Sequence, residues 1–532
     1  MVTPVEREVY SFTRIFTRRP KGLSPPHVTR GIWTEHGIYL LDLRVTHPPC
    51  PLAVLPVRYG MRTLLPLLAL FGCTADKSTE DTGADPANDS AADSGSDSGG
   101  DSGGDTADTT PIEITNIEAE IAEKVVTVVR VRWTTSAPSF DYVEYGETST
   151  YDKRTPLGEA TTDHEVLLLG NPAETDVHFR VVSAHADGGP TWTSEDLSIT
   201  TGILPAELPE LTITGAVTSW NGQYLVLPLQ GAAFVIAVID DQGRYVWYDV
   251  LEPGYNLMRA ILSHDGTAML YCMAGPQDNL SIGLVERVSL DGDVRTPIPF
   301  PYIDHDFVEL PDGTLAGIVV TPESGYTNEA DRIVEQAADG TQTDIWNAWE
   351  DERLAAWYNP GPHNWTHSNA LDYDVATDDY LISSKELGTI VRIDRATRTP
   401  IWYLNGRANE FTFTDGSPPG DMQHQFQLID GGIVVFDNGA QSRGWSRAVE
   451  LSLDETTKEA AEVWSYRHDP DLGVYAKGDV ERYADGNTRV VWSTAGEIQD
   501  VTPAGDVLWQ LNAELGYAMT FVTRVESLYG VE

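Results

Sequence analysis

Residues 378–402, DDYLISSKELGTIVRIDRATRTPIW, contain two sequence markers that recur along the chain. The first, Asp378-Asp-Tyr-Leu-Ile-Ser, is a turn followed by a strand. The second, Thr399-Pro-Ile-Trp402, is a strand that ends in tryptophan after a turn. Because both markers consist of turns and strands, the stretch indicates a repeating unit made of β-structure.

Six copies of each marker occur after residue 205. The turn-and-strand marker begins at Asn221, Asp265, Asp312, Asp378, Gly431 and Asp485. The second marker ends at Trp247, Trp346, Trp402, Trp464 and Trp509, and a degenerate copy at residues 292–298 fills the double gap after Trp247. Spacings of roughly 45–62 residues, all strand and turn, are typical of β-propeller blades, whereas a β-helix has a shorter period and a helical solenoid a 3.6-residue one. The sequence therefore predicts a six-bladed β-propeller over residues 205–532.

A smaller β domain is predicted ahead of the propeller, over residues 112–202. The runs 125–133, 142–145 and 177–183 alternate apolar and polar residues, which is typical of half-buried strands. The stretches Asp141-Tyr-Val-Glu-Tyr-Gly146 and Ala173-Glu-Thr-Asp-Val-His-Phe-Arg180 resemble those of fibronectin type III domains. The predicted fold class is therefore all-β, a small β-sandwich followed by the propeller.

The N-terminal part of the sequence indicates export and lipid attachment. Residues 61–73 have one arginine, a short apolar core and the ending Leu70-Phe-Gly-Cys73, the layout of a lipoprotein signal peptide. The alternative, a buried strand or short helix, fits poorly because residues 74–110 are an acidic Asp/Ser/Gly tether with no apolar surface to bury. We expect Cys73 to be acylated and the chain to be anchored to the cell envelope, in the outer membrane since Thr74 follows it. Residues 1–60 are expected to be a mis-assigned segment upstream of the true start at Met61.

The charge of the chain excludes one class of partner. It has 81 Asp and Glu against 35 Lys and Arg, a formal net charge of −46 at pH 7. A chain this acidic repels nucleic acid. If Cys73 holds lipid and Cys50 lies in the upstream segment, only Cys272 remains, so no internal disulfide is expected.

Three histidines occupy the same position in successive units. His305 lies seven residues before Asp312, His424 seven before Gly431, and His367 eleven before Asp378. Equivalent positions in successive propeller blades face a common axis, so these side chains should meet at one mouth of the central channel. Separate structural roles in turns or in the core are the alternative.

The contexts of these histidines resemble bacterial arylsulfotransferases that use no nucleotide sulfate donor. The similarity covers roughly residues 205–530, and the sandwich resembles that family's N-terminal domain. The matching motifs are His305-Asp-Phe with Glu309-Leu-Pro-Asp-Gly, Asn364-Trp-Thr-His-Ser-Asn with Tyr380-Leu-Ile-Ser-Ser-Lys, and Gln423-His-Gln with Phe436-Asp-Asn-Gly and Ser446-Arg-Ala-Val-Glu.

The resemblance implies a ping-pong transfer of a sulfuryl group from an aryl sulfate to a phenol. It makes His424 the nucleophile, and His305 and His367 the groups that hold the sulfate oxygens. Lys385 stands where the family has an arginine, and Asn369 and Asp306 are expected to support the site. The chemistry is sound, because a neutral imidazole is a nucleophile near pH 7 and a phenolate leaves easily. No cofactor or metal is implied, and the oligomeric state is left open.

Two departures from the family pattern keep other functions open. Lysine lacks the planar two-pronged grip of arginine at position 385, and Gln425 replaces an acidic residue after the nucleophile. A surface propeller that binds a partner after losing catalysis is therefore one alternative. A zinc site made by the three histidines is another. Turns such as Asp485-Gly-Asn487 could hold calcium, but hairpins favour the same residues, and His363 is a weaker candidate for the site.

Overall fold

The computed structural model describes residues 109–185, 189–276, 279–322, 328–416, 423–439 and 441–530. It also gives the backbone of three short strands, β1 (Ser11–Phe12), β2 (Arg30–Thr34) and β3 (Gly37–Leu41). The predicted signal peptide, its Cys73 and nearly all of the tether lie outside the described residues. Within the described residues, no helix is long and apolar enough to cross a membrane.

The first domain is a β-sandwich organised by one long strand. The first half of β5 (Val129–Gly146) pairs with β4 (Ile114–Ile121) and β7 (Thr161–Leu168). Its second half pairs with β6 (Lys153–Arg154) and β8 (Asp176–Ala184). The last two strands, β9 (Thr191–Thr193) and β10 (Leu197–Thr200), pair with β8. Trp133 and Tyr145, from the two halves of β5, and Phe179 of β8 are buried in one cluster. The alternation seen in the sequence therefore places one face of each layer in a shared core.

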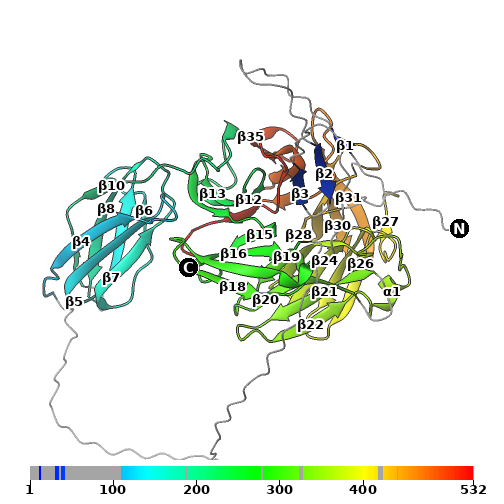
Figure 1. Cartoon of the computed structure of the whole chain (residues 1–532), viewed down its shortest axis with the longest axis horizontal. Coiled ribbons are helices and arrows are strands. Elements are labelled where there is room, and N and C mark those ends of the chain that lie inside the picture. Colours follow the sequence, from blue (N-terminus) through cyan, green and yellow to red (C-terminus); the bar gives the residue numbers. More distant parts are fainter. Residues whose placement is uncertain are drawn as a thin grey trace, which may run out of the picture. The chain divides into compact units, whose positions relative to one another are not determined.

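Six small sheets form the six blades of the propeller (Figure 1). Blade 1 contains β36 (Ala518–Met519), β37 (Thr523–Val525), β12 (Tyr224–Gln230), β13 (Phe234–Asp240) and β14 (Tyr245–Leu251). Blade 2 contains β15 (Asn256–Leu262), β16 (Ala268–Ala274), β17 (Leu284–Ser289) and β18 (Arg295–Pro299). Blade 3 contains β19 (Ile303–Glu309), β20 (Leu315–Pro322), β21 (Glu329–Gln336) and β22 (Gln342–Asn347).

The remaining blades follow in chain order. Blade 4 contains β23 (Ser368–Asp374), β24 (Asp379–Ser384), β25 (Thr389–Asp394) and β26 (Thr399–Leu404). Blade 5 contains β28 (Phe426–Ile429), β29 (Gly432–Asp437), β30 (Arg447–Asp454), β31 (Glu459–Arg467) and the short β27 (Thr412–Phe413). Blade 6 contains β32 (Asp479–Arg482), β33 (Thr488–Trp492), β34 (Glu497–Val501), β35 (Val507–Ala513) and β11 (Leu211–Gly215). In the part of the chain that the structure describes, the helical pieces are α1 (Glu352–Ala355) and two 3-10 turns, Leu280–Ile282 and Ser493–Ala495.

The two sequence markers have fixed places in these blades, and the predicted six-bladed all-β fold is confirmed. Each turn-and-strand marker leads into the second strand of a blade, while each tryptophan lies on the fourth. Trp247, Trp402 and Trp509 each have at most 1% of their surface exposed, so in these three blades the tryptophan belongs to the buried core, whereas Trp464 of β31 is only partly buried.

Both ends of the propeller segment close the ring. β11 adds an outer strand to blade 6 by pairing with β35, and Leu211 lies opposite Ala513. At the other end, β36 and β37 pair with β12 and supply the inner strands of blade 1. Each terminal blade therefore contains strands from both ends of the segment.

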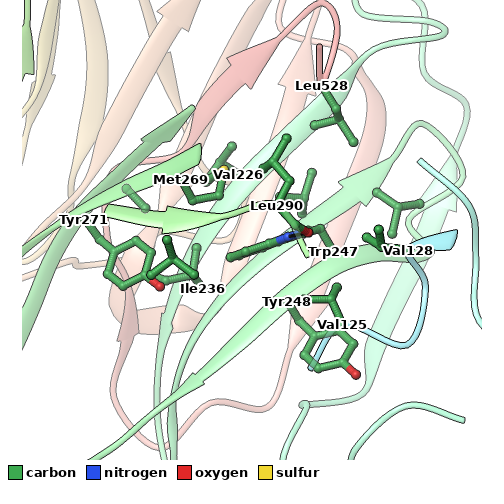
Figure 2. Packing of buried hydrophobic residues seen from close by; sticks show 14 of the residues in the cluster. Val125, Val128, Val226, Ile236, Trp247, Tyr248, Met269, Tyr271, Leu290 and Leu528 are labelled. Atoms are coloured by element: carbon green, nitrogen blue, oxygen red, sulfur yellow. Dashed lines mark hydrogen bonds between the residues drawn. The ribbon is translucent and has the colours of Figure 1, made fainter. Parts of the chain in front are cut away.

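The sandwich and blade 1 share a hydrophobic cluster (Figure 2). Val125 and Val128 of the sandwich pack with Trp247 and Tyr248 of β14. The hydroxyl of Thr127 also donates a 2.7 Å hydrogen bond to the carbonyl of Val246. Apolar burial and a satisfied buried hydroxyl therefore join the two domains.

Candidate active site

The three predicted histidines lie where the inner strands of blades 3, 4 and 5 begin. His305 is the third residue of β19, His367 directly precedes β23, and His424 lies two residues before β28. All three are buried, with 5–8% of their surface exposed. Inner strands line the axis of a propeller, so the structure brings the three side chains to one end of the central channel.

Local backbone distortion directs the first two of these side chains. His305 and His367 have φ values of 55° and 45°, in the left-handed region that few residues other than glycine adopt. The pairing of β19 and β23 with their neighbours shifts register near these residues, and such bulges re-aim side chains. The two rings lie 4.9 Å apart between centroids, at 63°, and His305 Nδ1 lies 3.0 Å from Asp304 Oδ2.

A buried carboxylate fixes the backbone of His367. Asp331 of β21 accepts hydrogen bonds from Asn364 Nδ2 at 2.7 Å and from the Thr366 hydroxyl and Ser368 N at 2.5 Å each. Asn364 Oδ1 in turn accepts from His367 N at 2.9 Å. Burial raises the pKa of Asp331, and these donors oppose that effect. The blade 3 carboxylate thus holds the blade 4 loop that presents His367.

His424 is bonded through both ring nitrogens. Its Nδ1 lies 2.6 Å from Asn438 Oδ1, and its Nε2 accepts from the backbone N–H of Lys477 at 3.0 Å. Burial lowers the pKa of His424 well below its usual value. The Asn438 bond opposes this effect, whereas the positive charges of Lys385, Lys477 and His305 add to it. The imidazole is therefore neutral at pH 7, the state that a nucleophile requires.

Two buried lysines accompany the histidines. Lys385 follows β24, and its backbone N–H donates to the His367 carbonyl at 3.1 Å, while its Nζ lies 3.7 Å from Glu386 Oε1. Lys477 precedes β32 of blade 6. Its Nζ donates to Met258 Sδ of β15 at 3.3 Å, so the side chain extends to blade 2. Burial lowers the pKa of Lys477, and Asp304 and Asp306 oppose this effect. Two buried amino groups, each with carboxylates nearby, therefore lie beside His424.

The residues expected to support the site have structural partners. Asn369 Nδ2 donates to the carbonyl of Gln423 at 2.9 Å, next to His424. Asp306 pairs with Arg259 at 3.0 Å and accepts from Leu371 N at 2.9 Å. The weaker candidate His363 is 68% exposed and pairs with Glu329 at 2.9 Å.

A family model described as Arylsulfotransferase (ASST) matches residues 221–507, more than half of the chain. The chain belongs to the arylsulfotransferase family. The match runs from the turn before β12 to the start of β35 and includes all three histidines and both buried lysines. No curated protein matches the chain significantly.

Three solved structures that resemble this arylsulfotransferase-family chain do so only remotely. A protein of unknown function from Bacteroides caccae is 14% identical, covers 57% of this chain and 99% of its own, and has a TM-score of 0.38. A chain of a nidogen–laminin complex is 10% identical, covers 57% of this chain and 98% of its own, and has a TM-score of 0.35. Virginiamycin B lyase from Staphylococcus aureus is 14% identical, covers 56% of this chain and 87% of its own, and has a TM-score of 0.32. Similarity this low supports no statement about function.

Two site residues of this family member were missed by the sequence reasoning. Lys477 lies eight residues before Asp485, so it has nearly the same repeat position in blade 6 as the histidines have in theirs. That signal was available for Lys477. Asn438 lies inside the quoted motif Phe436-Asp-Asn-Gly, but nothing in the sequence says that its side chain reaches His424.

The zinc alternative gains no geometric support in this chain. Among the described residues, no group of three or more His, Cys, Asp or Glu side chains is placed to hold a metal ion. His305 and His367 are neighbours, but His424 has its ring nitrogens engaged by Asn438 and Lys477.

Proposed function

We propose that this chain transfers a sulfuryl group from an aryl sulfate to a phenol through a sulfated His424. The family match supports arylsulfotransferase activity in general. The observation that favours His424 as the nucleophile is its buried, neutral imidazole. Its Nδ1 faces the amide oxygen of Asn438, and its Nε2 accepts a hydrogen bond from Lys477 N.

In the first step of the proposed reaction, the Nε2 lone pair attacks sulfur and the bond from sulfur to the aryl oxygen breaks. The electron pair of that bond leaves with the phenolate, which is stable because phenols ionise near pH ~10. In the second step an acceptor phenol loses its proton and attacks sulfur, and the S–N bond electrons return to Nε2. The proton lost by the acceptor balances the one gained by the leaving phenolate, so the exchange needs no nucleotide.

The side chains around His424 suit the charge that develops. A sulfuryl group in transfer spreads negative charge over its oxygens, and fixed donors that face it lower the barrier. We assign this role to His305, His367 and Lys385. Lys477 adds a further positive charge, since its field already acts on His424.

We also propose that the protein is anchored through lipid on Cys73 and that residues 74–110 tether a fibronectin III-like sandwich and the propeller to the envelope. The signal-like sequence at residues 61–73 supports this proposal. Mass analysis of the membrane-extracted chain should find an acylated Cys73 at its N-terminus; an unmodified Cys73 would contradict the anchor.

The proposed reaction is tested with 4-nitrophenyl sulfate and an excess of phenol. We expect phenol-dependent release of 4-nitrophenolate, loss of that release in His424→Ala, and a transient mass increase of one sulfuryl group on the wild-type chain. His178→Ala is the matched control, because His178 is a sandwich residue paired with Asp196. No release from folded protein, across several aryl sulfates, would favour a propeller that binds its ligand without turning it over.

A further inference from the structure

Asn438 has its orientation fixed by its neighbours. It follows β29, is 2% exposed, and its Nδ2 donates to the carbonyls of Val474 at 2.9 Å and Lys477 at 2.8 Å. An amide nitrogen is only a donor and an amide oxygen only an acceptor. With two carbonyls around Nδ2, the oxygen Oδ1 must be the atom that faces His424 Nδ1 at 2.6 Å.

This orientation determines the tautomer of the imidazole. Because Oδ1 can only accept, the proton of a neutral His424 must lie on Nδ1, and the lone pair must lie on Nε2. The second contact agrees, since Nε2 accepts from Lys477 N at 3.0 Å. His424, Asn438 and the Lys477 peptide thus form a closed cycle of hydrogen bonds, in which every group has one consistent role.

We propose that Asn438 is the positioning residue of the site, and that it holds the nucleophilic lone pair of His424 on Nε2. This proposal rests on the proposed function, because it assigns a role within the sulfuryl transfer. It also explains how the imidazole is oriented although Gln425 replaces the acidic residue that the family has after the nucleophile. The side-chain oxygen of Gln425 has no hydrogen-bond partner among the described residues. In this chain the imidazole is therefore oriented by Asn438 and not by the residue that follows His424.

A neutral amide also affects the intermediate. When Nε2 binds sulfur and Nδ1 keeps its proton, the ring takes on the positive charge of an imidazolium. Asn438 is too weak a base to remove that proton. In the second step, as the acceptor oxygen bonds to sulfur, the S–N electron pair returns to the ring and the leaving group is a neutral imidazole. A carboxylate at position 438 would instead stabilise the cation and slow its departure.

The hydrogen bond from Lys477 N to His424 Nε2 has to break during the reaction. This N–H occupies the lone pair that must attack, so the incoming sulfur has to replace that hydrogen bond. The Lys477 carbonyl can keep its bond to Asn438 Nδ2 meanwhile, so Asn438 continues to hold Nδ1 while Nε2 reacts.

The test compares the wild-type chain with Asn438→Asp in two measurements. The first is the 15N NMR spectrum of histidine-labelled protein through a pH titration, with the His424 signals assigned by their loss in His424→Gln. The wild type should show a protonated Nδ1 and an unprotonated Nε2 down to pH values well below the usual histidine pKa. In Asn438→Asp the carboxylate should favour the imidazolium and raise the His424 pKa by about one unit or more.

The second measurement is the pH dependence of kcat/KM for 4-nitrophenyl sulfate. The neutral imidazole is the active form and is present above the His424 pKa, so a raised pKa moves the acid limb to higher pH. Lys385, Lys477 and the titratable His305 also act on His424, and all three are unchanged in the variant. Sulfated enzyme should accumulate in Asn438→Asp, because its second step is slower.

Asn171→Asp is the matched control, since Asn171 is a buried sandwich amide that donates to the Leu168 carbonyl at 2.7 Å. It should change stability without moving either titration. If Asn438→Asp fails to fold, Asn438→Ser, which retains a hydroxyl, takes its place and should give a mixed His424 tautomer. A wild-type His424 protonated on Nε2, or a folded variant with unchanged titration, would overturn the proposal. Since NMR needs no turnover, an inactive wild type with the expected tautomer would refute only the proposed reaction.

Discussion

At the scale of single residues, the site depends on burying positive charge in an acidic molecule. Lys385 and Lys477 are each only 6% exposed. Burying an ammonium group is costly unless an anion compensates it. In this site Glu386 lies 3.7 Å from Lys385 Nζ, and Asp304 and Asp306 act on Lys477, so carboxylates offset part of this cost.

Lys385 allows a direct test of this charge. Lys385→Ala should lower kcat for 4-nitrophenyl sulfate by about 10²–10³-fold, as removal of one transition-state donor usually does. Lys385→Arg retains the charge and adds a planar fork that matches sulfate oxygens, so its kcat should equal or exceed that of the wild type. Steady-state kinetics and circular dichroism of both variants provide the check. An alanine variant with wild-type kcat would remove Lys385 from the mechanism.

At the scale of elements, the site is made by residues at or just before the starts of inner strands. His305, His367 and Lys477 all have positive φ values. A left-handed residue costs about 1–3 kcal/mol and persists only when its surroundings hold it. Those surroundings include the bonds of Asp331 to the His367 loop and of Asn438 to the Lys477 segment.

Gly478 tests how tightly the start of β32 is packed. Its φ is 113°, and a Cβ atom there would lie 2.2 Å from Cδ1 of the buried Phe436. Gly478→Ala should lower the free energy of unfolding by about 2–4 kcal/mol, from backbone strain plus overpacking. It should also lower activity, because Lys477 adjoins it.

Gly486→Ala is the matched control for that experiment. Gly486 has a φ of 90°, but the nearest atom to its added Cβ is Pro503 Cγ at 3.7 Å. It should therefore cost only the backbone strain, about 1–2 kcal/mol, and leave turnover unchanged. Urea unfolding and nitrophenolate release measure both quantities. Equal effects of the two alanines would show that contact with Phe436 is unimportant.

At the scale of the whole molecule, the C-terminal segment joins the domains. After β37 supplies an inner strand to blade 1, the hydroxyl of Tyr529 accepts from Leu169 N at 3.1 Å and donates to the Leu167 carbonyl at 2.8 Å. It also shares a 2.8 Å hydrogen bond with the hydroxyl of Tyr145. One residue therefore ties the end of the propeller segment to two strands of the sandwich.

Tyr529→Phe should weaken this connection. It leaves the N–H of Leu169 without its partner, which should cost about 1–3 kcal/mol of stability. We expect one thermal unfolding transition for the wild type, because the domains share a hydrophobic cluster, and an earlier sandwich transition in the variant. Tyr151→Phe is the control, since its hydroxyl donates to Asp196 on the exposed surface. Identical calorimetric traces for the two variants would contradict a coupling role for Tyr529.

Properties that follow from spacing were determined by the sequence alone. The two markers specified six blades and the strand that holds each tryptophan, because every blade repeats the same order of turns and strands. The common position of His305, His367 and His424 likewise predicted that they lie at one end of the channel. Repetition converts a position in the chain into a position around an axis, so no knowledge of contacts was needed.

Closure of the ring and individual side-chain contacts were decided only by the tertiary structure. The pairing of β11 with β35 and the reach of Lys477 to Met258 join distant parts of the chain, and the bond from Asn438 to His424 joins two side chains within blade 5. Strand pattern sets which face of a strand is buried, but the bulges, left-handed residues and loops that aim a side chain arise from packing against other blades. The tautomer of His424 is such a property, because it depends on two carbonyls that the segment between β31 and β32 brings to Asn438.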